Sequence, residues 1–147
     1  MDILKVSPDD VDAVRQLIEA VSEVDILPVF SEQGKAEYKA RVLPDIKQAF
    51  DMQRFYALKI SDSGVLLGFG ALKEGSYLTH LFVSKAIQGC GMGRKLLEEL
   101  MASTTASEMS LRASLNAAGF YESFGFTKTG PESDFNGIKF VPMKCVL

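Results

Sequence analysis

Three glycines alternate with other residues in Gln88-Gly89-Cys90-Gly91-Met92-Gly93-Arg94, the stretch of this sequence best suited to bind a ligand. The apolar, β-favouring run Tyr77–Val83 precedes it, and leucines at helical spacing follow it. The first amides of a helix have no partner within the helix, and the helix dipole is positive at that end. Because glycines leave the backbone open there, we expect this segment to bind an anion, and a phosphate in particular.

The spacing of the glycines distinguishes this segment from two common phosphate-binding loops. No Gly-Lys-Ser/Thr follows it, as a P-loop requires. The third glycine comes one residue too early for the dinucleotide-binding pattern, whose loop also follows the first strand of its domain. On the motif alone, a glycine-rich turn that only caps a packed helix is the alternative.

A second segment, residues 116–126, combines an amide side chain, a phenol and a Gly-Phe pair. Together the two segments resemble the GNAT-type N-acetyltransferases. The acetyl-CoA loop of that family has the pattern Gln/Arg-x-x-Gly-x-Gly/Ala, and a later segment brings Asn, Tyr and Gly-Phe in the same order. The matching residues here are Gln88, Gly91 and Gly93 in the first segment and Asn116, Tyr121, Gly125 and Phe126 in the second.

The resemblance implies an α+β fold of GNAT type. Its sheet is mixed, mostly antiparallel and twisted, with flanking helices and two splayed central parallel strands. Here those strands would be Tyr77–Val83 and Glu108–Ala113. The pantetheine arm of acetyl-CoA would lie in the gap and pair with unsatisfied backbone groups like an added strand.

The same resemblance assigns the acetyl-CoA contacts. The acetyl carbonyl would lie near Leu81, and the pyrophosphate would lie against amides of residues 88–94. Asn116 would hold the arm from the other wall, and Phe120 would pack on it. The complete set of expected contacts is Leu81, Phe82, Val83, Gln88, Gly89, Cys90, Gly91, Met92, Gly93, Arg94, Asn116 and Phe120.

Acetyl transfer to an amine needs a neutral amine, a polarised carbonyl and a proton for the departing thiolate. Direct attack in a ternary complex needs no nucleophilic side chain. Tyr121 matches the family's general-acid position, and a phenol with a pKa near 10 can protonate a thiolate of comparable basicity. The alternative is that Tyr121 only fills the core beside Phe120 and Phe124.

The general base stays open at this stage. No carboxylate lies in Tyr77–Val83, where some relatives carry a glutamate. His80 is the only histidine and suits base chemistry near neutral pH. Strand alternation puts Leu78, His80 and Phe82 on one face, so His80 could equally be a satisfied core residue. Water relaying protons to Glu32, Glu74 or a backbone carbonyl is a further alternative.

The remaining elements follow from periodicity and turn residues. Apolar residues at helical spacing predict a helix after Ser7-Pro8, and Pro44 should break a second helix over 35–50. Residues 24–34 are expected to form a loop or broken helix that walls the acceptor site with Phe30 and Glu32. Strands are expected at 3–6, 55–60, 65–72, Tyr77–Val83, Glu108–Ala113, 126–130 and Ile138–Val146, and further helices at 91–105 and 116–124.

Composition fits one domain over residues 1–147 that is 47% hydrophobic. No apolar run is long enough to cross a membrane, and the first residues lack an export signal, so a cytoplasmic location is expected. Two cysteines and one histidine suggest neither a disulfide framework nor a metal site. The net charge of −3 argues against nucleic acid and weakly favours a cationic acceptor. Apolar residues near the C-terminus, among them Phe135, Phe140 and Val146, suggest a homodimer.

These observations predict an N-acetyltransferase that uses acetyl-CoA and acts on a primary amine of a small molecule or peptide. Two alternatives stay open. The first is a non-catalytic acyl-CoA-binding or sensor module, which the missing strand carboxylate favours slightly. The second is an enzyme that acetylates a protein N-terminus or a lysine.

Overall fold

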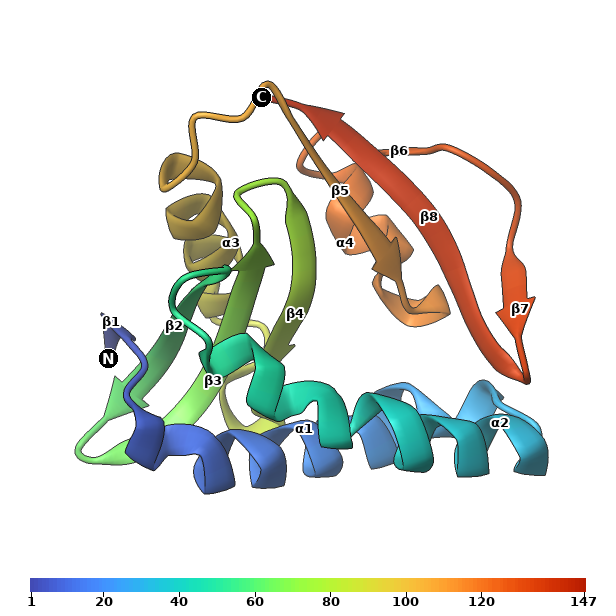
Figure 1. Ribbon diagram of the computed structural model, residues 1–147, viewed down its shortest axis with the longest axis horizontal. Coiled ribbons are helices and arrows are strands. Elements are labelled where there is room, and N and C mark those ends of the chain that lie inside the picture. The colour runs from blue at the N-terminus through green and yellow to red at the C-terminus, as the bar shows by residue number, and fades with distance from the viewer.

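Eight strands form one mixed sheet with helices on both faces (Figure 1), in a computed structural model that describes residues 1–147. The strand order is β1-β2-β3-β4-β5-β8-β6, and β7 pairs with β8 beside this path. The strands are β1 (Asp2–Lys5), β2 (Phe55–Asp62), β3 (Val65–Lys73), β4 (Tyr77–Val83), β5 (Glu108–Ala113), β6 (Thr127–Lys128), β7 (Ser133–Phe135) and β8 (Ile138–Val146). The α-helices are α1 (Val11–Asp25), α2 (Glu32–Glu37), α3 (Met92–Ala102) and α4 (Ala118–Glu122).

Helix α1 covers one face of the sheet. A 3-10 turn over Pro8–Asp10 leads into α1, and its start is fixed by Pro8 and by Ser7, whose backbone N–H donates to the Asp10 carboxylate at 2.8 Å. The buried stripe Val14, Leu17, Ile18 and Val21 packs in one cluster with Phe69 and Ala71 of β3. This apolar spacing places α1 directly against the central strands.

Helix α3 covers the opposite face. Leu96, Leu97 and Leu100 are fully buried, in a cluster that also holds inward residues of β2, β4, β5 and β8. A Cβ on Gly70 would lie 2.7 Å from Leu100 Cδ1, so a glycine there lets α3 approach the sheet closely. The helix therefore fixes the position of the glycine-rich segment at its N-terminus.

A β-bulge at Thr79 divides β4. Ala71 pairs with His80, but the next residue of β3, Leu72, pairs with Leu78, so Thr79 is the extra residue. As a result Leu78 packs on the α3 side, whereas Phe82 packs on the α1 side. The expectation that Leu78, His80 and Phe82 share a face is therefore wrong, because the bulge interrupts the alternation.

Strands β4 and β5 separate just beyond the bulge. Their parallel pairing covers only Tyr77 with Ser110 and Leu78 with Leu111. In Figure 1 the two strands lie together at the top and diverge toward the helical layer below them. The bulge bends β4 away from β5, and the expected splay of the central parallel pair is present.

The segment between α1 and β2 is more irregular than predicted. Helix α2 begins at Glu32, a π-helical turn spans Tyr38–Val42, and a 3-10 helix spans Pro44–Phe50. The predicted break at Pro44 is confirmed, since proline takes the first position of the new segment, whereas the π-helical turn and the 3-10 helix were not predicted.

The C-terminal strands also differ from expectation. Strand β6 is only two residues long, and β7 was not predicted. The β7–β8 turn packs on α2 through two glycines: a Cβ on Gly34 would lie 2.1 Å from the Gly137 carbonyl oxygen. Val141 is buried, whereas Phe135 and Val146 are exposed, so the apolar C-terminal residues form no single exposed patch, and the homodimer stays a prediction. None of the helices is both long and apolar enough to span a bilayer.

Candidate active site

A groove of about 550 Å³ lies where β4 and β5 separate. It is lined by eleven of the sequence-predicted site residues: Leu81, Phe82, Val83, Gln88, Gly89, Gly91, Gly93, Arg94, Asn116, Phe120 and Tyr121. The side chains of Cys90 and Met92 lie elsewhere. Met92 is buried in the core under α3, and the Cys90 thiol donates to the Ile87 carbonyl at 2.7 Å. The fold thus brings two segments distant in sequence to one groove.

The backbone of β4 offers free hydrogen-bonding groups to this groove. The Ser84 N–H donates to the Leu67 carbonyl at 2.8 Å, and Phe82 pairs with Phe69 two residues back. Alternate residues of an antiparallel strand point the same way, so Leu81 and Val83 direct their N–H and C=O groups toward β5. Strand β5 does not pair there.

One of these groups is already used within the protein. The Gln88 side-chain amide donates to the Val83 carbonyl at 3.0 Å. The N–H and C=O of Leu81 and the N–H of Val83 are left for a ligand. An extended amide chain could pair with them as a strand would.

The glycine-rich segment presents its backbone at the start of α3. Gly89 and Gly91 have φ of 87° and 84°, a left-handed conformation that favours glycine. Gly91 caps α3, and a Cβ on Gly93 would lie 3.5 Å from Val83 and 3.9 Å from Phe120. A larger side chain at Gly93 would extend into the groove. The first amides of α3 are therefore placed where they could meet an anion.

Arg94 and a polar bridge between Asn116 and Asp25 line the groove. The Arg94 guanidinium lies 4.5 Å from the centre of the Phe124 ring and donates to Ser123 Oγ at 3.4 Å. At the other side, Asn116 Nδ2 donates to the Asp25 carbonyl oxygen at 2.6 Å. Asp25 also accepts from Lys85 Nζ at 3.0 Å. The bridge ties the start of α4 to the end of α1.

Tyr121 is buried, with 8% of its surface exposed, and packs edge-on against Phe120 and Phe126 at 5.4 and 5.6 Å. Burial raises the pKa of Tyr121 above its ordinary value of 10. Its hydroxyl has no partner in the protein. Since no fully buried side-chain oxygen or nitrogen lacks a partner, this hydroxyl must reach accessible space. It is therefore a protonated donor available to a ligand.

His80 is held by the bulge residue. The Thr79 hydroxyl donates to the Ala71 carbonyl at 3.1 Å, so its only proton is already used. Thr79 Oγ1 must then accept from His80 Nδ1, 2.8 Å away, which leaves the lone pair on Nε2. Burial lowers the pKa of His80 from 6.5 to about 4, and the ring contacts Phe69 edge-on at 5.6 Å. The histidine is therefore neutral near pH 7, with one fixed tautomer.

A second cavity of about 420 Å³ lies between β4, β5, the β7–β8 hairpin and the helical layer. Tyr77, His80 and Phe30 line it, and burial raises the pKa of Tyr77, with a partial offset from Arg112. Glu32 and Glu74 do not line it: they pair with Lys35 and Arg54. These glutamates are therefore poorly placed to relay protons from this cavity.

Several lining residues of this second cavity were not assigned to the site from the sequence: Arg41, Asp45, Arg112, Phe135, Lys139 and Phe140. They come from three segments that only the tertiary structure joins. The alternation of β5 could have indicated Arg112. Met109, Leu111 and Ala113 face the core, which leaves Arg112 on the other face of the strand.

The two cavities meet. Both are lined by Ile26, Leu81, Phe82, Ser114, Ala117 and Tyr121. A ligand extended along β4 and a second ligand in the other cavity would therefore come together beside Leu81 and Tyr121.

Comparison with known families agrees with this geometry. The model of a family described as "Acetyltransferase (GNAT) domain" matches residues 26–147. The chain belongs to the GNAT acetyltransferases. The sequence-based fold class is confirmed as well, since the GNAT acetyltransferases of known structure share this mixed sheet and its flanking helices.

Individual relatives of this GNAT acetyltransferase are distant. The Escherichia coli peptidyl-lysine N-acetyltransferase YjaB is 31% identical over 100 residues, which cover 65% of this chain and 64% of YjaB. A GCN5-related N-acetyltransferase from Rhodopseudomonas palustris has a TM-score of 0.82 at 22% identity, covering 99% of this chain and 95% of that one. The Thermoplasma acidophilum PaiA N-acetyltransferase, solved with coenzyme A, has a TM-score of 0.72 at 21% identity, covering 99% and 98%. The match thus spans less than two thirds of YjaB.

Proposed function

We propose that the protein transfers the acetyl group of acetyl-CoA to a primary amine of a small molecule or peptide, by direct attack in a ternary complex. The observation that carries the proposal is the junction of the two cavities at Leu81 and Tyr121. The groove runs along the unpaired edge of β4. The second cavity is mainly apolar with a few polar groups. A donor and an acceptor can therefore meet without a covalent enzyme intermediate.

The groove residues fit acetyl-CoA group by group. The amides at the start of α3 and Arg94 suit the pyrophosphate. The free groups of Leu81 and Val83 suit the two amides of the pantetheine arm. The Leu81 N–H would then polarise the thioester carbonyl and stabilise the negative charge that develops on its oxygen. PaiA was solved in complex with coenzyme A, which supports acetyl-CoA as the donor in a protein of this fold.

Tyr121 is the proposed general acid. When the amine nitrogen bonds to the carbonyl carbon, the C–S bond breaks and the departing thiolate takes the Tyr121 proton. Burial raises the pKa of the Tyr121 phenol, and it would equally raise the pKa of a thiol in the same dry site. The pKa values of the acid and of the leaving thiol thus stay close to each other.

His80 is the proposed proton acceptor for the amine. Its Nε2 carries the lone pair because Thr79 fixes the proton on Nδ1, and the ring lines the acceptor cavity. A neutral histidine near pH 7 can take the proton that the nitrogen loses as the new C–N bond forms. Because the pKa of His80 is low, the ring holds this proton only briefly and passes it on to water.

The acceptor is defined here only as a primary amine. A peptide is included because the relative YjaB is named a peptidyl-lysine N-acetyltransferase. A non-catalytic binding module is disfavoured by the free Tyr121 hydroxyl at the cavity junction.

The test follows thiol release from acetyl-CoA over a panel of small amines and lysine-containing peptides, with the products identified by mass spectrometry. We expect at least one amine to gain 42 mass units, roughly the mass of an added acetyl group, in step with thiol release. Binding of acetyl-CoA with no acetylated product from any amine would support the binding-module alternative instead.

A further inference from the structure

Most of the charged residues that line the acceptor cavity are basic. These residues are Arg41, Arg112, Lys139 and Asp45, three basic side chains against one acidic side chain. Most of the other lining residues are apolar. The protein as a whole carries a net charge of −3, so basic residues outnumber acidic ones in this lining although they do not in the whole chain.

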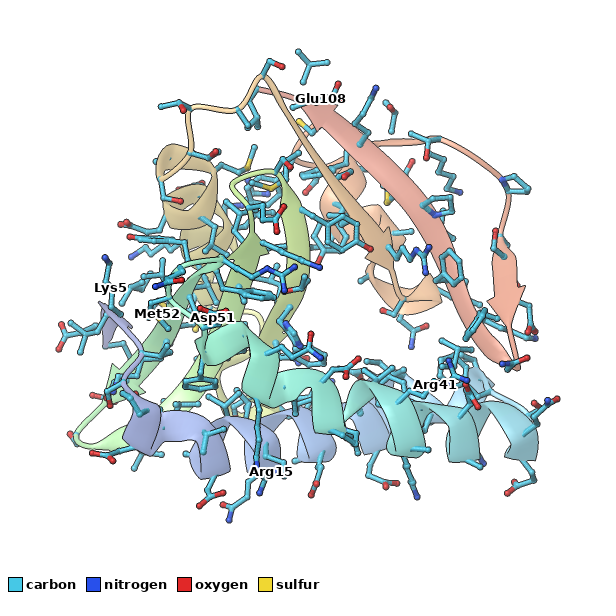
Figure 2. All side chains as sticks on the ribbon, viewed as in Figure 1. Lys5, Arg15, Arg41, Asp51, Met52 and Glu108 are labelled. Carbon is cyan, nitrogen blue, oxygen red and sulfur yellow. The ribbon has the colours of Figure 1, made fainter.

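The cations differ in how far the protein neutralises them. Arg41 forms an ion pair with Glu37 at 2.5 Å and lies over the Phe135 ring. Figure 2 places Arg41 in the helical layer, near the lower end of β8. Arg112 and Lys139 have no carboxylate within ion-pair distance. Lys139 shares its strand parity with buried Val141, which directs its side chain away from the Phe140 face. Arg112 is therefore the unneutralised cation aimed at the cavity.

The Arg112 guanidinium is already positioned. It lies over the Phe140 ring with 4.7 Å between Cζ and the ring centre, which orders its long side chain. Its charge acts on the Tyr77 phenol, whose side chain lines the same cavity. A planar guanidinium held in this way retains its N–H groups for a carboxylate or a phosphate, which it can bind through two parallel hydrogen bonds.

Arg112 also lies at a useful distance from the reaction centre. Leu111 pairs with Leu78, and Leu81 lies three residues further along β4. At about 3.3 Å per residue, Arg112 is offset from Leu81 by roughly 7 Å along the strand direction, and the divergence of β4 from β5 adds a sideways separation. A molecule of a few carbon atoms could therefore place its amine beside Leu81 while its other end meets Arg112.

We propose that Arg112 binds an anionic group of the acceptor, so that the substrate is a primary amine that also bears a carboxylate or a phosphate. The proposal rests on the acetyltransferase activity proposed above and names its substrate class. The charge of Arg112 would also disfavour polycationic amines that carry no anionic group.

The test compares three matched series of acceptors: ω-amino carboxylates of increasing length, their amides, and ω-aminoalkyl phosphates. At the best length, we expect the anionic acceptors to exceed the amides in kcat/KM by about tenfold or more. Comparing the carboxylate and phosphate series identifies which anion is preferred. Equal rates for anionic and neutral acceptors would overturn the proposal.

Variants distinguish binding of the acceptor's anionic group by Arg112 from a general loss of activity. In Arg112→Gln, we expect about tenfold higher KM for the anionic acceptors and little change for the amides, with partial rescue in Arg112→Lys. The control is Arg15→Gln, because Figure 2 shows Arg15 on the outer side of α1. An equal loss for anionic acceptors and amides in Arg112→Gln would also overturn the proposal.

Failure of the underlying activity has a different signature. If the enzyme is not an acetyltransferase, no series is acetylated at all. The same acceptors are then tested as ligands of the protein–CoA mixture by thermal unfolding. The proposal still requires anionic amines to raise Tm more than their amides, and more so in wild type than in Arg112→Gln. No such difference would overturn it.

Discussion

Replacing Tyr121 with phenylalanine removes only the hydroxyl group that carries the proposed catalytic proton. The substitution keeps the ring, whose edge-on contacts with Phe120 and Phe126 at 5.4 and 5.6 Å hold it in place. The hydroxyl has no partner in the protein, so its removal breaks no internal hydrogen bond. We therefore expect the free energy of unfolding to change by less than about 0.5 kcal/mol.

Turnover should respond far more strongly. A positioned general acid contributes about 10²-fold or more, which corresponds to about 2.7 kcal/mol of activation free energy. The assay measures kcat for thiol release and Tm on the same Tyr121→Phe preparation, with acetyl-CoA affinity as a third reading. The loss in kcat should shrink with acetyl thioesters of more acidic thiols, because those thiolates leave without a proton.

Tyr38→Phe is the matched control. The Tyr38 hydroxyl is hydrogen-bonded to Ser22 Oγ at 2.7 Å in a buried site. Its removal should lower stability by about 1–2 kcal/mol without any dependence of the loss on the leaving thiol. A stable Tyr121→Phe enzyme with wild-type kcat, or a loss unrelated to thiol acidity, would refute the reasoning for Tyr121.

Three further predictions concern the groove, His80 and the acceptor wall. Acetyl-CoA at about 100 times its Kd should raise Tm by roughly 5–10 °C. Gly93→Glu should abolish this shift by placing a carboxylate at the pyrophosphate site. Because the folded pKa of His80 is about 4 and the unfolded value 6.5, the wild type should lose up to about 3 kcal/mol of stability as the pH falls from 6.5 to 4, and His80→Gln should not. Gly34→Ala should force the β7–β8 turn outward, lower stability by about 1–3 kcal/mol and raise acceptor KM.

Each of these predictions has a control. Gly119→Glu adds the same charge at an exposed glycine whose Cβ would meet no atom within 4 Å, and it should keep the acetyl-CoA shift. Denaturant unfolding at pH 4.5 and 7 compares wild type with His80→Gln, and equal pH dependence would refute the assigned cause. Gly130→Ala, whose Cβ would lie at an ordinary 3.4 Å from Pro142, should leave acceptor KM unchanged. An unchanged KM in Gly34→Ala would contradict the proposed role of the turn as a wall.

The sequence was sufficient to predict most residues that line the groove, because the patterns that mark them are local. Glycines at the start of a helix and a contiguous aromatic segment specify their own conformation, and helical spacing fixes how α3 packs. Cys90 and Met92 were assigned to the site through their backbone amides, so the positions of their side chains leave that prediction untested. Helical periodicity turns the Met92 side chain into the core.

The acceptor side depended on long-range structure. The bulge at Thr79 is a register shift between two strands, so the alternation of β4 alone could not reveal it. The cavity wall needs the contact of Gly34 with Gly137, which lie far apart in the chain. Arg112 becomes notable only once the splay of β4 and β5 opens a cavity beside it.

Amide hydrogen exchange along β4, measured by NMR with and without acetyl-CoA, tests the central claim most directly. The account predicts that the Leu81 and Val83 amides, which face the gap, exchange quickly in the free protein and become protected at saturating acetyl-CoA. The Phe82 amide, which faces β3, should be protected in both states. Unchanged exchange at Leu81 and Val83 in the presence of bound acetyl-CoA would contradict the account.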